Sequence, residues 1–78
     1  MLLEIVTPDK EIFNGEIALA TFPGSEGSFG VMENHAPMIA TLKEGRIKVV
    51  DESKKEQFFS VNGGVVEVNN NKIIVLAE

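Results

Sequence analysis

Cysteine is absent from this 78-residue chain, so no disulfide can cross-link the fold and no thiolate can hold a metal ion. Long apolar runs are absent too, because no stretch approaches the roughly 20 residues that a membrane-spanning helix needs. The first residues, Met1-Leu2-Leu3-Glu4, have neither the basic nor the long apolar region of a signal peptide. No Asn-x-Ser/Thr sequon occurs. We therefore expect a cytosolic chain that reaches a membrane only through a partner protein, without direct insertion into lipid.

Basic residues are scarce in the first half of the chain, and the whole net charge of −5 arises there. Residues 1–39 contain six acids and one base, whereas residues 40–78 contain six of each. An acidic surface repels nucleic acid and anionic lipid, so we expect no nucleic-acid partner. Two explanations remain open: the acids face a basic protein partner, or they only keep a small domain in solution.

The length predicts a single domain, residues 1–78, near the lower size at which a chain folds alone. Such a domain buries only roughly 60% of the surface that its unfolded chain exposes. With 44% hydrophobic residues and no disulfide, its stability depends on a small core and on backbone pairing. Binding to a partner would add stability by mass action.

Short apolar runs between turn residues dominate the sequence, and many of them alternate apolar with polar residues. Residues 46–50 are typical of a sheet with one solvent-exposed face. Asn14-Gly15 predicts a hairpin turn, because both residues tolerate positive φ. The expected strands cover residues 3–7, 10–13, 16–22, 28–32, 38–42, 46–50, 57–61, 65–68 and 72–77.

About nine short strands without a helical segment predict an all-β fold, an antiparallel sandwich or barrel. With so few residues, two small sheets must share one core. We expect Phe13, Phe22, Phe58 and Phe59 to fill that core together with the valine and isoleucine positions.

Gly24, Gly27 and Gly30 recur at every third residue, which raises the possibility of a phosphate-binding loop. Such a loop requires Gly-Lys-Ser/Thr and a following helix whose N-terminus faces the anion. This segment has no lysine and no helical pattern, and Glu26 would repel a phosphate. The glycines are therefore interpreted as turn residues between strands.

His35 is the only histidine, which leaves too few ligands for a zinc site. The alternating acids of a calcium loop are missing as well. Glu26 and Glu33 are two carboxylates without the sugar cleft of a glycosidase. No nucleophile-elbow pattern surrounds any of the serines Ser25, Ser28, Ser53 and Ser60. We therefore expect a non-catalytic protein without a cofactor or a metal ion.

Apolar residues crowd around His35 in a segment that is expected to be partly loop. They are Val31, Met32, Ala36, Pro37, Met38 and Ile39. Loops usually run over the surface, and an exposed apolar patch indicates a protein interface. The alternative is that these side chains only close one end of the sandwich. The local sequence favours neither explanation.

One stretch resembles a known family. Residues 23–31, Pro-Gly-Ser-Glu-Gly-Ser-Phe-Gly-Val, followed by His35-Ala36-Pro37, are similar to the most recognisable part of the F-type ATP synthase epsilon subunit, which is called delta in mitochondria. Four further blocks resemble the family in the same order, namely residues 3–8, 13–16, 63–68 and 75–77. The resemblance therefore spans essentially the whole chain.

The resemblance implies a small flattened β-sandwich of nine to ten strands at the foot of the central stalk, on the cytoplasmic face of the bacterial inner membrane. This rotor subunit is non-catalytic and couples the gamma subunit to the ring of c subunits during ion-driven ATP synthesis. By position, the polar loops of the c-ring would face Ser25, Glu26, Gly27, Ser28 and Phe29. The gamma subunit would face His35, Ala36, Pro37, Met38 and Ile39.

The chain departs from the family pattern in three places. Many relatives have an acid where Ser28 stands, so the ring contact would depend on Glu26 here. Many have Pro-Gly before the histidine, whereas this chain has Glu33-Asn34, in which Asn34 can adopt the left-handed conformation. Most bacterial relatives continue into a C-terminal helical hairpin that can inhibit ATP hydrolysis, and this hairpin is absent from the 78 residues.

A second function stays open beside the rotor role. A free-standing β-sandwich module could bind an extended peptide by strand addition at an exposed sheet edge. Such a module would bind an extended peptide and would be indifferent to the gamma subunit.

Overall fold

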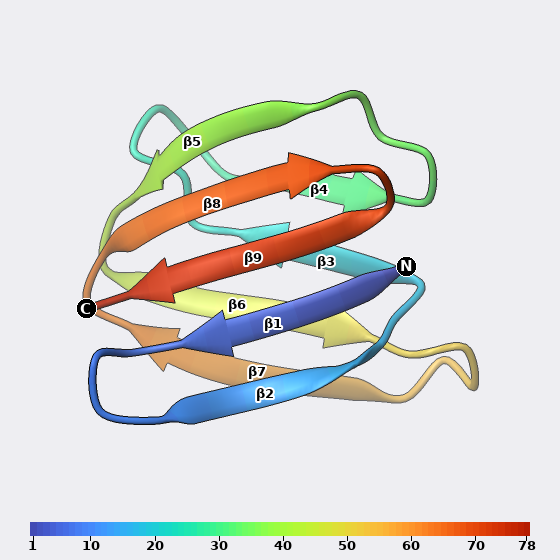
Figure 1. The fold of residues 1–78 in the computed structure, drawn as a ribbon. Helices are drawn as coiled ribbons and strands as arrows, with labels where there is room; N and C mark the ends of the chain where they lie inside the picture. Colours follow the sequence, from blue (N-terminus) through green and yellow to red (C-terminus); the bar gives the residue numbers. More distant parts are fainter.

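The computed structural model describes all 78 residues, which form nine β-strands and no helix. The strands make two sheets that pack face to face (Figure 1). Sheet A has the order β2-β1-β9-β8-β5, and sheet B has the order β4-β3-β6-β7. The strands are β1 (Leu2–Val6), β2 (Glu11–Glu16), β3 (Leu19–Phe22), β4 (Phe29–Met32), β5 (Met38–Leu42), β6 (Gly45–Val50), β7 (Glu56–Val61), β8 (Gly64–Asn69) and β9 (Lys72–Ala77). The predicted all-β sandwich is confirmed.

Neighbouring strands are antiparallel with one exception. Strands β1 and β9 run parallel, with Leu2 opposite Lys72 and Val6 opposite Leu76. They lie side by side in the middle of sheet A (Figure 1). The structure has no helix long and apolar enough to cross a membrane.

The hairpin predicted at Asn14-Gly15 is wrong. Strand β2 runs straight through both residues, and Asn14 pairs with Glu4 while Gly15 pairs with Leu3. Pairing with β1 fixes this segment as a strand, because tertiary contacts override the local turn preference of the dipeptide. The chain changes sheets only after Glu16, so the expected strand over residues 16–22 shortens to β3.

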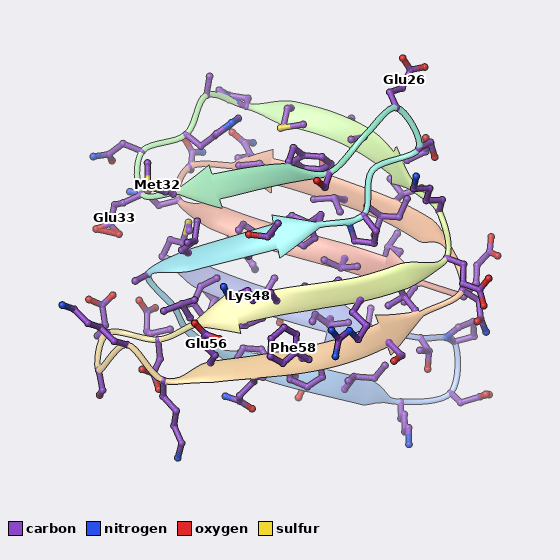
Figure 2. All side chains as sticks on the ribbon, turned by 180° about the vertical axis from the view of Figure 1, so that it is seen from behind. Glu26, Met32, Glu33, Lys48, Glu56 and Phe58 are labelled. Carbon is purple, nitrogen blue, oxygen red and sulfur yellow. The ribbon has the colours of Figure 1, made fainter.

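Ten side chains in the core are completely inaccessible to solvent: Leu3, Ile5, Ile17, Ala20, Phe22, Val31, Ile47, Val66, Ile73 and Val75. Phe13 and Phe59 pack against this core, and their ring centroids lie 5.3 Å apart. The expectation for Phe58 is wrong, because its side chain is 47% exposed. Phe58 and Phe59 are neighbours on β7, so they must point to opposite faces of sheet B. Figure 2 shows Phe58 on the outer face.

Candidate functional site

The glycine-rich loop, residues 23–28, connects β3 to β4 within sheet B but is attached to sheet A. Gly24 forms an isolated bridge with Leu42 of β5. The Ser25 N–H donates to the Thr41 carbonyl oxygen at 2.9 Å, and the Lys43 N–H donates to the Pro23 carbonyl oxygen at 2.9 Å. The loop therefore joins the two sheets across one open edge of the sandwich, and its base is fixed by backbone hydrogen bonds.

Two glycines of this loop are required by its geometry. A Cβ atom on Gly24 would lie 2.5 Å from the Gly27 carbonyl oxygen and 2.8 Å from the Phe29 ring, both closer than real contacts allow. Gly27 has a φ of +127°, a conformation that side chains rarely adopt. The interpretation as turn residues fits Gly24 and Gly27 but is wrong for Gly30, which lies inside β4 and pairs with Thr21 of β3.

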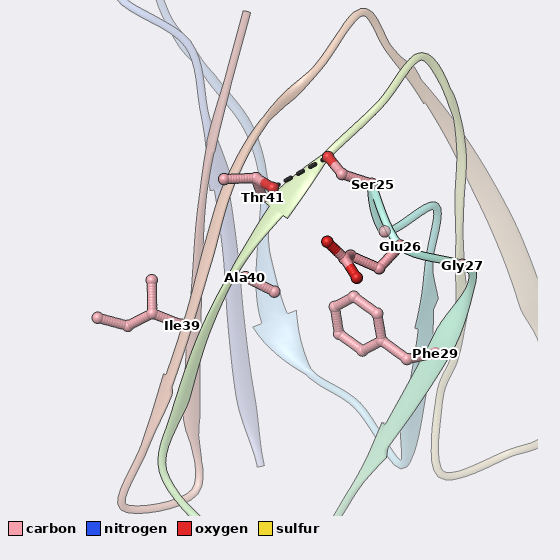
Figure 3. Close-up of a pocket in the computed structure, with 8 residues that line it drawn as sticks. Ser25, Glu26, Gly27, Phe29, Ile39, Ala40 and Thr41 are labelled. Atoms are coloured by element: carbon pink, nitrogen blue, oxygen red, sulfur yellow. Dashed lines mark hydrogen bonds between the residues drawn. The ribbon is translucent and has the colours of Figure 1, made fainter.

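A hollow of about 370 Å³ opens between this loop and β5 (Figure 3). Its lining consists of Gly24, Ser25, Glu26, Gly27, Phe29, Ile39, Ala40 and Thr41. The Phe29 ring forms one wall and packs on Phe22, with ring centroids 5.4 Å apart. On the opposite side, the Thr41 hydroxyl donates to the Ser25 hydroxyl at 2.9 Å.

Glu26 gives the hollow its only ionic group. In Figure 3 its carboxylate lies beside the Phe29 ring, on the side of the hollow. Glu26 is exposed and belongs to none of the salt bridges of the chain, so its charge is free for a partner. Apolar walls with one acid at the rim suit a long side chain that ends in a positive charge.

The residues expected to face gamma lie in three different places. Ile39 lines the hollow and is 71% exposed, so the structure brings it next to the c-ring candidates. Met38 instead packs against the core. Ala36 and Pro37 are exposed and His35 is half-buried, at the end of the sandwich where Asn70 and Asn71 make the β8–β9 turn.

His35 has no arrangement that indicates catalysis. Its Nδ1 lies 2.7 Å from the Ala36 carbonyl oxygen, which requires Nδ1 to carry the proton and donate. The preceding Asn34 adopts the left-handed conformation with a φ of 65°, as the sequence allowed. Its backbone N–H donates to Asn71 Oδ1 at 2.6 Å, and Asn71 Nδ2 donates back to Asn34 Oδ1 at 3.1 Å. This turn is thus held by side-chain amides.

The ionisable groups give no sign of an active centre. No group of three or more His, Cys, Asp or Glu side chains could hold a metal ion. The pKa of the Met1 amine is raised above its ordinary value, mainly by a hydrogen bond to Glu33 and also by Glu16. This amine is not part of the hollow.

The outer face of sheet A continues from the hollow as an apolar stripe. Val65 is paired with Thr41 on one side and with Leu76 on the other. Leu76 and Val65 are 57% and 37% exposed, and Ile74 is half-buried beside them. Because residues in register across a sheet share one face, these side chains form one surface with Ile39.

Sequence reasoning missed this surface and part of the hollow. Ala40 and Thr41 line the hollow, yet Thr41 is 16 residues from its partner Ser25 in the sequence, and no local pattern predicts that the two segments meet. Val65 and Leu76 belong to strands in which apolar and polar residues alternate. This alternation predicts that one face of the strand is exposed, but it does not predict which other segments lie beside that face.

Comparison with known proteins supports one family over the whole length. Residues 1–78 match the family described as ATP synthase, delta/epsilon chain, beta-sandwich domain. The ATP synthase epsilon chain of Campylobacter concisus is 43% identical over 76 residues, which are 97% of this chain and 59% of that protein. The epsilon chain of Desulfatibacillum aliphaticivorans is 46% identical over 78 residues, 100% of this chain and 55% of that protein. The chain thus spans little more than half the length of these two relatives.

Two solved structures contain chains of similar fold. One comes from the Euglena gracilis mitochondrial ATP synthase, OSCP/F1/c-ring in rotational state 1, with a TM-score of 0.93, 25% identity, and coverage of 99% of this chain and 49% of that chain. The other comes from the Tetrahymena thermophila mitochondrial ATP synthase central stalk/c-ring, with a TM-score of 0.82, 22% identity, and coverage of 99% and 62%. The second likeness shows the fold alone. With a family match from its first residue to its last, this chain belongs to the delta/epsilon chains of ATP synthase, as their β-sandwich domain.

Proposed function

We propose that this chain is a non-catalytic part of the central stalk, or rotor, of an F-type ATP synthase, and that it couples the gamma subunit to the c-ring during ion-driven ATP synthesis. The family membership supports this role, as does the likeness to a chain in an F1/c-ring assembly. The complex would hold the domain at the cytoplasmic face of the bacterial membrane.

One observation carries the proposal: backbone hydrogen bonds join the loop expected to face the c-ring to β5, the strand that carries Ile39 of the segment expected to face gamma. The loop is fixed to β5 at Gly24 and Ser25, and β5 presents Ile39 two residues before Thr41. A force applied to the tip of the loop therefore reaches the outer face of sheet A without crossing a flexible linker. A coupling element needs such a stiff connection between its two partners.

On the gamma side, the apolar stripe supplies the contact area. Ile39, Val65 and Leu76 expose apolar surface, and Glu67 lies between Ile39 and Ile74 in the register. An apolar patch with a few charges is typical of the centre of a protein interface. We expect His35, Ala36 and Pro37 to extend this surface at one end of the sandwich, where Pro37 lines a shallow hollow together with Ile39 and Glu67.

On the ring side, the tip of the loop supplies charge and little area. Ser25, Glu26, Gly27 and Ser28 are exposed, and Phe29 is half-buried under them. Ser28 contributes no charge, so Glu26 carries the electrostatic contact with basic groups on the polar loops of the ring. This contact would steer binding more than it would strengthen it.

Titration calorimetry of the chain into gamma subunit from the same source tests the gamma contact. Ile39→Asp places a charge on the stripe and should weaken binding at least about tenfold, a loss typical of a central interface residue. Met32→Asp is the matched control, because Met32 is 64% exposed but belongs to β4 at the edge of sheet B (Figure 2). Equal affinities of the two variants would refute the sheet A assignment. A folded chain that does not bind gamma at all would favour the peptide-binding module instead.

A further inference from the structure

The sandwich has four edge strands, and three of them are protected against pairing with another chain. Strand β2 carries Glu11 and Glu16, and its register with β1 shifts at a bulge between Ile5 and Val6. Strand β4 is only four residues long. Strand β5 is covered near its end by the glycine-rich loop. Charge, bulges, short length and coverage are the usual means by which proteins block a free sheet edge.

The fourth edge, β7, has none of these protections beyond one terminal acid. It pairs with β6 over all six residues, from Glu56 opposite Val50 to Val61 opposite Gly45, without a register shift. It contains no proline, and Glu56 is its only charged residue. None of the backbone hydrogen bonds outside the paired strands reaches it. One side of this strand is therefore open to a further strand.

The register determines which backbone groups of β7 are free. The Asp51 N–H donates to the Lys55 carbonyl oxygen at 3.0 Å, so this pair is hydrogen-bonded at the start of the β6–β7 hairpin. In an antiparallel ladder, hydrogen-bonded pairs alternate with pairs that are not hydrogen-bonded. The N–H and C=O groups of Gln57, Phe59 and Val61 are therefore bonded to β6. The N–H and C=O groups of Glu56, Phe58 and Ser60 consequently point away from the sheet.

The side chains of these three residues lie on the outer face of sheet B. Phe58 is 47% exposed, and the Arg46 guanidinium carbon lies 4.6 Å from its ring centroid. Glu56 forms a salt bridge with Lys48, with Nζ and Oε2 3.5 Å apart. Ser60 is small and lies opposite Arg46 in the register. Figure 2 shows Phe58, Lys48 and Glu56 together on this face.

We propose that β7 pairs antiparallel with β7 of a second copy of this chain, around a two-fold axis at Phe58. The two Phe58 residues are then directly opposite each other, and Glu56 of each copy is opposite Ser60 of the other. Glu56, Phe58 and Ser60 of each copy have N–H and C=O groups that are not bonded to β6. In this register, each of these groups forms a hydrogen bond with the second copy. The two B sheets become one continuous eight-stranded sheet.

The side chains make this pairing self-complementary. In the joined sheet, Arg46 lies opposite Ser60, and Ser60 lies opposite Glu56 of the second copy. The backbones of Arg46 and that Glu56 are therefore two strand spacings, or roughly 10 Å, apart. An arginine and a glutamate side chain together cover that distance, and the small Ser60 does not obstruct them. The symmetry forms this ion pair twice, and the facing Phe58 rings add an aromatic cross-strand pair.

The proposal goes beyond the rotor function, because it uses β7, which belongs to neither of the two proposed rotor contacts. The outer face of sheet A and the glycine-rich loop lie away from β7, which is the last strand of sheet B on the opposite edge (Figure 1). A pair of six-residue strands buries less than a standard interface, so the association is weak, with a dissociation constant on the order of 100 µM.

Sedimentation equilibrium of the 78-residue chain, from about 10 µM to about 1 mM, measures this association. Ser60→Pro removes a free N–H without breaking a bond to β6, so it should abolish the dimer and leave the monomer folded. Arg46→Glu and Glu56→Arg should each raise the dissociation constant by about tenfold, and the double exchange should restore it. Glu52→Arg, an equal charge change in the neighbouring turn, should have little effect.

A second readout does not depend on any variant. Exchange of the Phe58 amide hydrogen should slow as the protein concentration rises, whereas the exposed Glu26 amide should exchange at a constant rate. A chain that stays monomeric at about 1 mM would overturn the proposal. So would a dimer that tolerates Ser60→Pro, or one that is weakened by Ile39→Asp instead, because each outcome places the contact elsewhere. A binding result with gamma decides the rotor function independently.

Discussion

The two open edges of the sandwich are closed by different means. At the β4/β5 edge, the glycine-rich loop crosses from one sheet to the other and is fixed by backbone hydrogen bonds at Ser25 and Lys43. At the β2/β7 edge, only side chains meet, chiefly the rings of Phe13 and Phe59. Directional bonds hold the first edge in one geometry and leave a hollow behind the loop. Packing closes the second edge but leaves one side of the β7 backbone unpaired.

The largest expected effect comes from opening the first edge. Gly24→Ala would place a Cβ 2.5 Å from the Gly27 carbonyl oxygen, so the base of the loop must move. We expect the free energy of unfolding to fall by about 2–3 kcal/mol, as for an overpacked core position. Gly30→Ala is the control, because a Cβ there would have its nearest neighbour at 3.7 Å. Urea unfolding measures both, and equal losses would show that the loop is not tightly held.

A smaller effect is expected from weakening the second edge. Phe59→Ala removes one ring of the closing pair, and we expect a loss of about 2 kcal/mol, below the value for a fully buried phenylalanine because Phe59 is half-buried. Phe58→Ala removes an exposed ring with one cation–π contact and should cost about 0.5–1 kcal/mol. Urea unfolding should be done at low micromolar protein, where self-association does not contribute. A larger loss at Phe58 would contradict the assignment of Phe59 as the residue that closes this edge.

The smallest expected effect is a pH dependence at the end of the sandwich that joins both edges. The Met1 ammonium donates to Glu33 Oε1 at 3.1 Å and lies 3.3 Å from Glu16 Oε1, and these acids belong to opposite edges. The hydrogen bond to Glu33 is the main cause that raises the pKa of the amine above 8.0, while burial opposes the rise. Since the pKa is higher in the folded chain, the stabilisation is complete below about pH 8 and is lost as the pH rises through the folded pKa.

The measurement is the urea midpoint between about pH 7 and about pH 9.5. The decline should be small, because the Glu16 and Glu33 side chains are 71% and 61% exposed and water weakens both pairs. Glu33→Gln should flatten the profile further. A decline that is unchanged in that variant would assign the pH dependence to other groups.

Most of the sheet framework was predictable from residues 28–77. There, alternating runs lie between clear turn residues, and the predicted strands 38–42 and 72–77 match β5 and β9 residue for residue. The prediction failed at Asn14-Gly15, where a strong turn dipeptide lies inside a strand that β1 holds in place. The turn preference of Asn-Gly is smaller than the energy of pairing with β1, so it does not determine the conformation of this segment.

The candidate site was predictable only in part. The loop residues carry a recognisable pattern, but the hollow exists because Ala40 and Thr41 of β5 lie under the loop. That contact depends on how two sheets are stacked, which no local pattern encodes. The adjacent Phe58 and Phe59 show the same limit, since alternation requires one of them to face out without saying which one.

The parallel pair in the centre of sheet A has a consequence for the order of synthesis. Strand β1 has β2 on one side and β9, the last strand of the chain, on the other. During translation, Leu3 and Ile5 are therefore made long before Ile73 and Val75, the residues that lie opposite them on β9. The core around Leu3 and Ile5 stays incomplete until β9 has been made. Pairings of such high sequence separation slow folding and leave apolar edges uncovered meanwhile. A ribosome-bound chain that ends before residue 72 should thus remain accessible to chaperones, and release of the last strand should complete the domain in a single step.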